Sequence, residues 1–145
     1  MADATTTFRA EVLTPNGKVY DGEMFQVSVR TVVGEVGIRA RHAPMLARLV
    51  PHEMRLFESE SDFGSSGGAR RYAAAEGWLE VFANKVTVLV TEAIDPDQLD
   101  VADLKARIED AEGRLESADE ESAAHRTAEQ DKVRAEAFLE IANGS

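Results

Sequence analysis

The chain has 145 residues, 43% of them hydrophobic, which is enough for one sizeable core or for a core with an appended element. The absence of cysteine excludes disulfides, thiolate metal sites and thiol catalysis, and a formal net charge of −11 argues against a nucleic-acid surface, because carboxylates repel phosphates. Its longest apolar run is too short to cross a bilayer, and the start of the chain lacks a basic end followed by an apolar stretch, so we expect a mature cytosolic protein.

Alternating apolar residues predict the first strands. A strand over 8–13 is followed by Thr14-Pro15-Asn16-Gly17, a turn in which Asn-Gly supplies positive φ. The return strand begins at 18–20, and a longer strand is predicted over 24–33. In that strand the core-facing residues are Phe25, Val27 and Val29, and the solvent-facing residues are Gln26, Ser28 and Arg30.

Residues 34–44 read as a polar loop that contains Gly34 and Gly37 and runs into an apolar segment. Glu35 and His42 lie in it, and three interpretations are open. They could be an acid and a base brought together by the loop, or structural residues that hold a turn and satisfy loop carbonyls. They could also be polar contact residues at a loop tip that faces a partner, which fits a rigid β framework best.

The remainder of the N-terminal part continues as short strands between turns. The predicted elements are a buried segment at 45–50, strands at 54–58, 71–76, 77–82 and 85–91, and a loop at 60–68. Strands that recur every eight to twelve residues or so, with no helical pattern between them, indicate an antiparallel β-sandwich or flattened barrel.

From Pro96 onward the hydrophobic period becomes helical. A first helix is predicted over 97–117, with Asp100 as its N-cap, and a second over 120–142, ending at Asn143-Gly144. Together they predict an antiparallel helical hairpin. The apolar stripe of the first helix consists of Leu104, Ile108, Ala111 and Leu115.

We therefore expect two domains, a sandwich over 1–94 and a hairpin over 95–145. Residues 1–96 carry 13 acidic and 10 basic side chains (13 − 10 = 3, net −3), whereas residues 97–145 carry 14 and 6 (14 − 6 = 8, net −8). Alanine supplies much of the hairpin seam, and such a seam buries little apolar surface. The hairpin could detach, or it could be an acidic solubilising tail that is always docked.

Signatures of common catalytic and cofactor sites are missing. The glycine-rich stretch at 64–68 has no following Lys-Ser/Thr and reads as a linker rather than a phosphate loop. His42, His52 and His125 have no spacing that would bring two of them onto a metal, and no Gly-x-Ser-x-Gly motif is present.

Four blocks of the sequence, in order, carry a resemblance to a known family. They are Gly34-Glu35-Val36-Gly37-Ile38 with His42-Ala43-Pro44-Met45-Leu46, then Pro51 with Met54-Arg55-Leu56, then Gly77-Trp78-Leu79-Glu80-Val81, then Asn84-Lys85-Val86-Thr87-Val88-Leu89. Jointly, over residues from about 8 to 116, they resemble the epsilon-subunit family of the rotary F-type ATP synthase, the counterpart of mitochondrial delta.

The resemblance implies a sandwich of about ten strands, a two-helix hairpin and a non-catalytic central-stalk subunit. Such a subunit would couple gamma to the c-ring, lie peripherally at the cytoplasmic face of the bacterial plasma membrane, and meet alpha and beta through its hairpin to regulate hydrolysis. By resemblance, Glu35 and His42 would face the c-ring. The alternative is a free-standing β-sandwich binding module with an acidic helical tail.

The sequence also departs from that family. Ala40-Arg41 replaces the usual Pro-Gly, so Arg39 and Arg41 add positive charge that would face acidic lipid headgroups or a c-ring carboxylate. His52 stands where a small glycine is usual. ATP-binding members carry an arginine where this chain has Asp103, so we expect no cofactor and no tight ATP binding.

The family's inhibitory contact uses basic residues of the second helix. The candidates here are Arg126, Lys132 and Arg134. Because acidic residues are interleaved with them, we expect only a weak regulatory role, with a hairpin that resembles those thought to stay folded.

Overall fold

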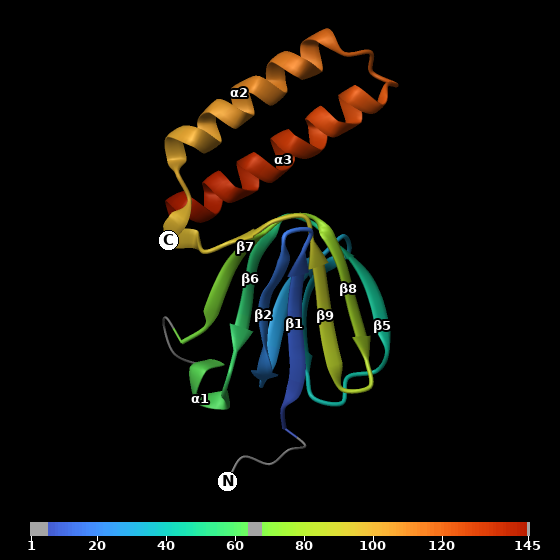
Figure 1. The fold of residues 1–145 in the computed structure, drawn as a ribbon, viewed down its shortest axis with the longest axis vertical. Helices are drawn as coiled ribbons and strands as arrows, with labels where there is room; N and C mark the ends of the chain where they lie inside the picture. Colours follow the sequence, from blue (N-terminus) through green and yellow to red (C-terminus); the bar gives the residue numbers. More distant parts are fainter. Residues whose placement is uncertain (1–5, 64–67, 145) are drawn as a thin grey trace. The chain divides into compact units, whose positions relative to one another are not determined.

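The computed structural model describes residues 6–63 and 68–144, and the chain divides between Ile94 and Asp95 into two compact units (Figure 1). Within the described residues, the first unit is a ten-stranded β structure. Its strands are β1 (Phe8–Thr14), β2 (Gly17–Met24), β3 (Gln26–Thr31), β4 (Gly34–Arg39), β5 (Met45–Leu49), β6 (His52–Phe57), β7 (Arg70–Ala74), β8 (Gly77–Phe82), β9 (Lys85–Val90) and β10 (Ala93–Ile94). The predicted sandwich followed by two helices is confirmed.

The strands are hydrogen-bonded in the order β10-β7-β6-β3-β5-β8-β9-β1-β2, and β4 pairs with the other edge of β3. Neighbours are antiparallel except β1 and β9, which pair in parallel with Val12 opposite Val88. This pairing joins the first strand to a strand near the end of the domain, which local alternation cannot reveal. The inner faces meet in a core centred on Phe8, Val12, Val27, Ile38, Met54, Leu56, Leu79 and Val88.

A tight hairpin replaces part of the predicted loop. The strand predicted over 24–33 ends at Thr31, and the chain turns through Val32 and Val33 into β4. Gly34 has a φ of 133°, and the Thr31 hydroxyl donates to the Gly34 carbonyl oxygen at 2.8 Å. The prediction of a loop over 34–44 was wrong because a turn with two exposed valines does not look like a turn in sequence.

One residue and one segment of the first unit depart from their predictions. Gln26, placed on the solvent face by alternation, is buried, and its side-chain amide donates to the Ser28 hydroxyl at 2.9 Å. The predicted loop at 60–68 contains a short helix, α1 (Glu60–Phe63). Residues 64–67, at the centre of the predicted linker, lie outside the described residues.

The second unit begins with the 3-10 turn η1 (Pro96–Gln98) and continues as α2 (Val101–Ser117) and α3 (Ala123–Gly144). Asp100 is the N-cap of α2, as predicted, and accepts from the amides of Ala102 and Asp103. The second helix starts later than predicted because the Ser122 hydroxyl accepts from the His125 amide. The buried side chains of the two helices are Leu104, Ala111, Ala128, Ala135 and Phe138.

Candidate functional site: exposed surfaces of the sandwich and the hairpin

The β3–β4 hairpin carries a charged pair behind an apolar tip. Arg30 and Glu35 are directly opposite in the register, and Arg30 Nη2 lies 2.9 Å from Glu35 Oε1. The hydrogen bond from Arg30 is the main cause that lowers the pKa of Glu35. Val33 at the tip is 92% exposed, and Val32 is also exposed. The tip therefore offers apolar contact area next to a carboxylate.

Glu35 and His42 do not meet. Glu35 is at the start of β4 and His42 follows its end, so the four residue steps to Arg39 alone separate them by roughly 13 Å. The His42 Nδ1 lies 2.7 Å from the Ala43 carbonyl oxygen, a local contact within its own loop. The acid–base interpretation is therefore excluded, and a single loop tip cannot present both residues.

Arg39 and Arg41 lie at the same end of β4 as His42, and each is tied to its surroundings. Arg39 Nε donates to the buried Gln26 at 2.8 Å, and its guanidinium stacks over Phe25 and Phe63. Arg41 has a φ of 61°, and its amide donates to Asn84 Oδ1 at 2.7 Å. The Arg39 side chain is exposed and is oriented by contacts within this chain, and its contact with a lipid headgroup or a ring carboxylate stays a prediction.

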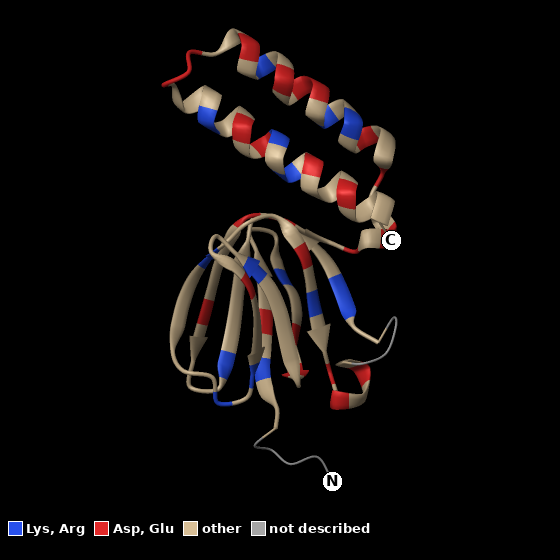
Figure 2. Ribbon diagram, turned by 180° about the vertical axis from the view of Figure 1, so that it is seen from behind, with Lys and Arg blue, Asp and Glu red and all other residues tan. Residues whose placement is uncertain are grey.

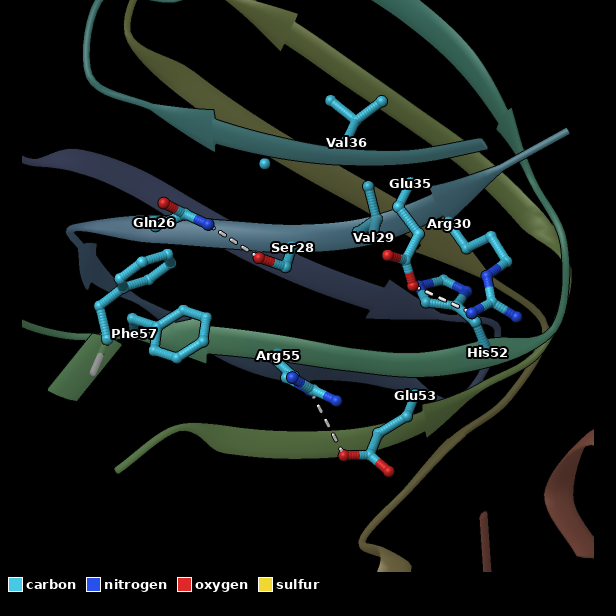
Figure 3. Close-up of a pocket in the computed structure, with 12 residues that line it drawn as sticks. Gln26, Ser28, Val29, Arg30, Glu35, Val36, His52, Glu53, Arg55 and Phe57 are labelled. Atoms are coloured by element: carbon cyan, nitrogen blue, oxygen red, sulfur yellow. Dashed lines mark hydrogen bonds and ion pairs between the residues drawn. The ribbon is translucent and has the colours of Figure 1, made fainter. Parts of the chain in front are cut away.

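A hollow of about 430 Å³ lies over the sheet formed by β3, β4 and β6 (Figure 3). Its lining includes Ser28, Arg30, Glu35, His52 and Arg55. His52 is only 5% exposed, and burial is the main cause that lowers its pKa. The sequence showed this histidine as a departure from the family pattern and as an isolated histidine without metal-site spacing, and neither feature indicates that it is buried.

An apolar surface covers the outer face of the β5-β8-β9 sheet. The register places Trp78 between Arg48 and Leu89 on neighbouring strands. Trp78 is 47% and Leu46 69% exposed, and Phe82 and Leu89 are exposed as well. A groove of about 500 Å³ runs beside Trp78 and Leu89 toward Pro15. Large apolar side chains grouped in this way are typical of a protein interface.

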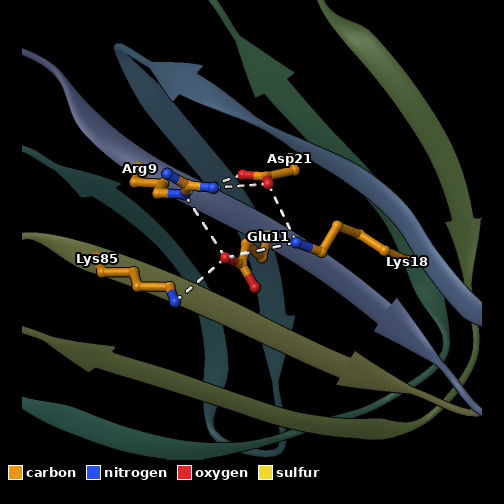
Figure 4. Close-up of polar contacts among 5 residues, drawn as sticks. All are labelled: Arg9, Glu11, Lys18, Asp21 and Lys85. Carbon is orange, nitrogen blue, oxygen red and sulfur yellow. Dashed lines mark hydrogen bonds and ion pairs between the residues drawn. The ribbon is translucent and has the colours of Figure 1, made fainter.

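A network of charges continues the same outer face over β1, β2 and β9 (Figure 4). Glu11 lies within ion-pair distance of Arg9 (3.5 Å), Lys18 (3.8 Å) and Lys85 (3.2 Å). Asp21 accepts hydrogen bonds from Arg9 and Lys18, which lower its pKa. The outer face is thus apolar over β5, β8 and the adjacent part of β9, and it is charged over β1, β2 and the start of β9.

Acidic side chains outnumber basic ones on both hairpin helices (Figure 2). Each basic residue that was predicted to be regulatory is in contact with another residue of the hairpin. Arg134 lies 3.4 Å from Asp131, and Lys132 lies 3.8 Å from Glu112 across the seam. The Arg126 guanidinium donates to the Glu121 carbonyl oxygen at 3.0 Å. All three cations are therefore engaged in the folded hairpin.

Residues 6–63 and 68–144 contain no group of three or more His, Cys, Asp or Glu placed to hold a metal. Over the same residues, every helix is too short or too polar to span a bilayer.

Comparisons with known proteins agree on one family. The model of the "ATP synthase, Delta/Epsilon chain, beta-sandwich domain" family matches residues 7–96. The ATP synthase epsilon chain of Halalkalibacterium halodurans is 36% identical over 136 residues, which cover 94% of this chain and 97% of that protein. That of Alkalihalophilus pseudofirmus is 40% identical over 112 residues, 77% of this chain and 79% of that protein.

A sodium-specific relative is also similar. The ATP synthase epsilon chain of Propionigenium modestum, named as sodium ion specific, is 37% identical over 109 residues, covering 75% of this chain and 74% of that protein.

Solved structures share the fold at low sequence identity. A chain in the Euglena gracilis mitochondrial ATP synthase (OSCP/F1/c-ring) aligns with a TM-score of 0.73 at 20% identity, covering 94% of this chain and 82% of that one. A chain in the central stalk and c-ring of the Tetrahymena thermophila mitochondrial ATP synthase aligns with a TM-score of 0.60 at 18% identity, covering 92% and 95%.

Proposed function

The chain belongs to the ATP synthase delta/epsilon family, and from this we propose that it is a non-catalytic rotor subunit that couples gamma to the c-ring. The observation that carries the proposal is a rigid sandwich with two separate contact surfaces, the apolar sheet face and the β3–β4 tip. Glu35 and His42, the residues that could have formed an acid–base pair, lie at opposite ends of β4. A subunit that transmits torque needs contacts of this kind and no active site.

We assign gamma to the outer face of the β5-β8-β9 sheet. Trp78, Leu46 and Leu89 provide exposed apolar area of the kind that dominates binding energy, and Trp and Arg are over-represented among such residues. Arg48 lies opposite Trp78 and, among the described residues, has no ion-pair partner. A gamma segment with apolar residues and a carboxylate for Arg48 would fit this face.

We assign the c-ring to the β3–β4 tip, with Glu35 as its carboxylate. Val32 and Val33 supply apolar contact, and Glu35 supplies a charge-assisted contact to basic or amide groups of the ring loops. The resemblance also implied a c-ring contact for His42, and Arg39 and Arg41, which depart from the family pattern, were expected to face lipid headgroups or a ring carboxylate. Their position at the opposite end of β4 removes them from a contact made by this tip.

The hairpin is proposed to regulate hydrolysis only weakly through alpha and beta. Extending it would break the contact of Lys132 with Glu112 across the seam before that cation could reach a partner, and Arg134 would keep its contact with Asp131 within α3. Membrane association is proposed to be peripheral, on the cytoplasmic face of a bacterial plasma membrane and through the complex alone.

Purification of the membrane complex through a tag on this chain tests the assignment. Gamma and the c-ring should co-purify in fixed proportion after detergent extraction. Recovery of only unrelated soluble proteins would contradict the proposal and would favour the free-standing binding module.

A further inference from the structure

His52 is the only ionisable side chain that is buried among the described residues. Its Nδ1 lies 2.7 Å from the Val50 carbonyl oxygen, an acceptor, so in the neutral ring Nδ1 carries the hydrogen. Nε2 then holds a lone pair, and it has no hydrogen-bond partner among the described residues. A buried ring with one unsatisfied nitrogen is poised to change its partners when it gains a proton.

The charged groups around His52 come from three strands (Figure 3). Arg30 of β3 disfavours an imidazolium at His52, whereas Glu35 of β4 favours it. Glu53 and Arg55 follow on β6 itself and line the same hollow. Across the register on β7, His52 faces Ala74, which has no charge.

Protonation would place a second donor and a positive charge in the hollow. The Val50 carbonyl is already used by Nδ1–H, so the new Nε2–H needs another acceptor. Glu35 is the carboxylate that acts electrostatically on His52, and it is at present bonded to Arg30. Arg30 contacts only Oε1 of Glu35, and a carboxylate has lone pairs on both oxygens, so an imidazolium at His52 would share the Glu35 carboxylate with Arg30 and weaken that contact.

We propose that His52 is a proton-operated switch beneath the β3–β4 hairpin, whose protonated ring donates from Nε2 to Glu35 and competes with Arg30 for that carboxylate. The proton comes from solvent and no covalent bond changes. In the neutral state Arg30 and Glu35 neutralise each other, and in the protonated state two cations share one carboxylate, which leaves a net positive charge beside the exposed tip.

Resting on the proposed function, this switch makes the c-ring contact depend on pH. Acidification would shift the tip from a neutral ion pair toward a net positive charge, which weakens a contact with basic groups of the ring loops. The burial that lowers the pKa of His52 places this change on the acidic side of neutrality.

NMR of the isotope-labelled full chain between pH 8 and 5 tests the switch directly. The amides of Val33 and Gly34 should move with the midpoint of the His52 ring and not with that of His42. E35Q should lower the His52 midpoint, because it removes the charge that favours the imidazolium. R30Q should raise it, because it removes the charge that opposes the imidazolium. Neither variant should move the midpoint of His42, which serves as the internal control.

The proposal is overturned if His52 stays neutral between pH 8 and 5, or if the shifts of the Val33 and Gly34 amides do not follow the His52 midpoint. It is also overturned if E35Q and R30Q shift that midpoint in the same direction. In H52Q the pH dependence of the tip amides should disappear. If H52Q fails to fold, the surface variants E35Q and R30Q still test the proposal, because they leave His52 in place. Because the titration uses the isolated chain, its failure is distinct from a failure to co-purify with gamma and the c-ring.

Discussion

The guanidinium of Arg39, at the end of β4, lies 5.2 Å from the ring centre of Phe63 in α1. Phe63 also meets Phe57 edge to face, at 5.1 Å between ring centres. The α1 segment is thus fastened to the sheet by aromatic contacts, although its sequence is typical of a loop. Arg39 therefore contributes to the fold of this chain by joining the end of β4 to α1.

Replacing Phe63 by alanine should loosen α1 and leave the sandwich intact. A cation–π contact of this kind contributes roughly 0.5–1 kcal/mol at an exposed site, so global stability should fall only slightly. Amide hydrogen exchange over Glu60–Phe63 should accelerate severalfold. Phe82→Ala is the matched control, because Phe82 is exposed and has no ring partner among the described residues. Equal exchange in both variants would show that Phe63 fastens nothing.

Trp78→Ala should weaken the binding of gamma without unfolding the sandwich. An anchor of this kind typically contributes about 2 kcal/mol or more, which corresponds to an affinity roughly 30-fold lower. Titration of the full chain with purified gamma by calorimetry measures the change. Val133→Ala, at a similarly exposed apolar position on α3, should bind as the unaltered chain does. Unchanged affinity for the Trp78 variant would move gamma to another face.

A chain that ends at Ile94 should fold and join the complex. The cut must follow β10, because Ala93 and Ile94 pair with Ala74 and Ala73 of β7. A cut at Val90 would leave the edge of β7 unpaired. The truncated chain should show a cooperative unfolding transition and co-purify with gamma, with only the rate of ATP hydrolysis altered. Loss of proton pumping would instead mean that the hairpin is needed for coupling.

The full chain should not bind MgATP at micromolar concentration. Asp103 Oδ2 lies 2.9 Å from Arg107 Nε, one helical turn along, so a carboxylate occupies the position of a phosphate-binding arginine and engages a neighbouring cation. Calorimetric titration should give only heats of dilution. Saturable heat in that range would show that the hairpin binds nucleotide by another route.

Local patterns predicted the strands, Asp100 and the helical pair because they depend on alternation, caps and a period of 3.6 residues. The β3–β4 hairpin escaped notice because its turn is made of Val32 and Val33, residues typical of strands. The contact of Arg39 with Phe63, and the hollow that His52 and Glu35 both line, bring together segments that are distant in sequence. Neither hydrophobic periodicity nor turn-forming residues can predict such contacts.

The stability of the sandwich should depend on pH in two separate ranges. Burial lowers the pKa of His52 in the folded state below its ordinary value of 6.5, so the unfolded chain binds the proton more readily. Stability should therefore decrease as pH falls through about 6.5, until the folded ring is itself protonated. The pKa of Glu35 is lowered from 4.5 by Arg30, so its contribution is present above that pH and is lost only in stronger acid.

Denaturant unfolding of the chain ending at Ile94, at pH 7.5, 6.5 and 5.5, separates these ranges. H52Q should abolish the loss of stability between pH 7.5 and 5.5, whereas H42Q, altered at the other end of β4, should retain it. E35Q should make the loss larger, because without its carboxylate the folded state resists protonation of His52 more strongly. A chain equally stable at pH 7.5 and 5.5 would mean that His52 is solvated when protonated and is not held beneath the hairpin.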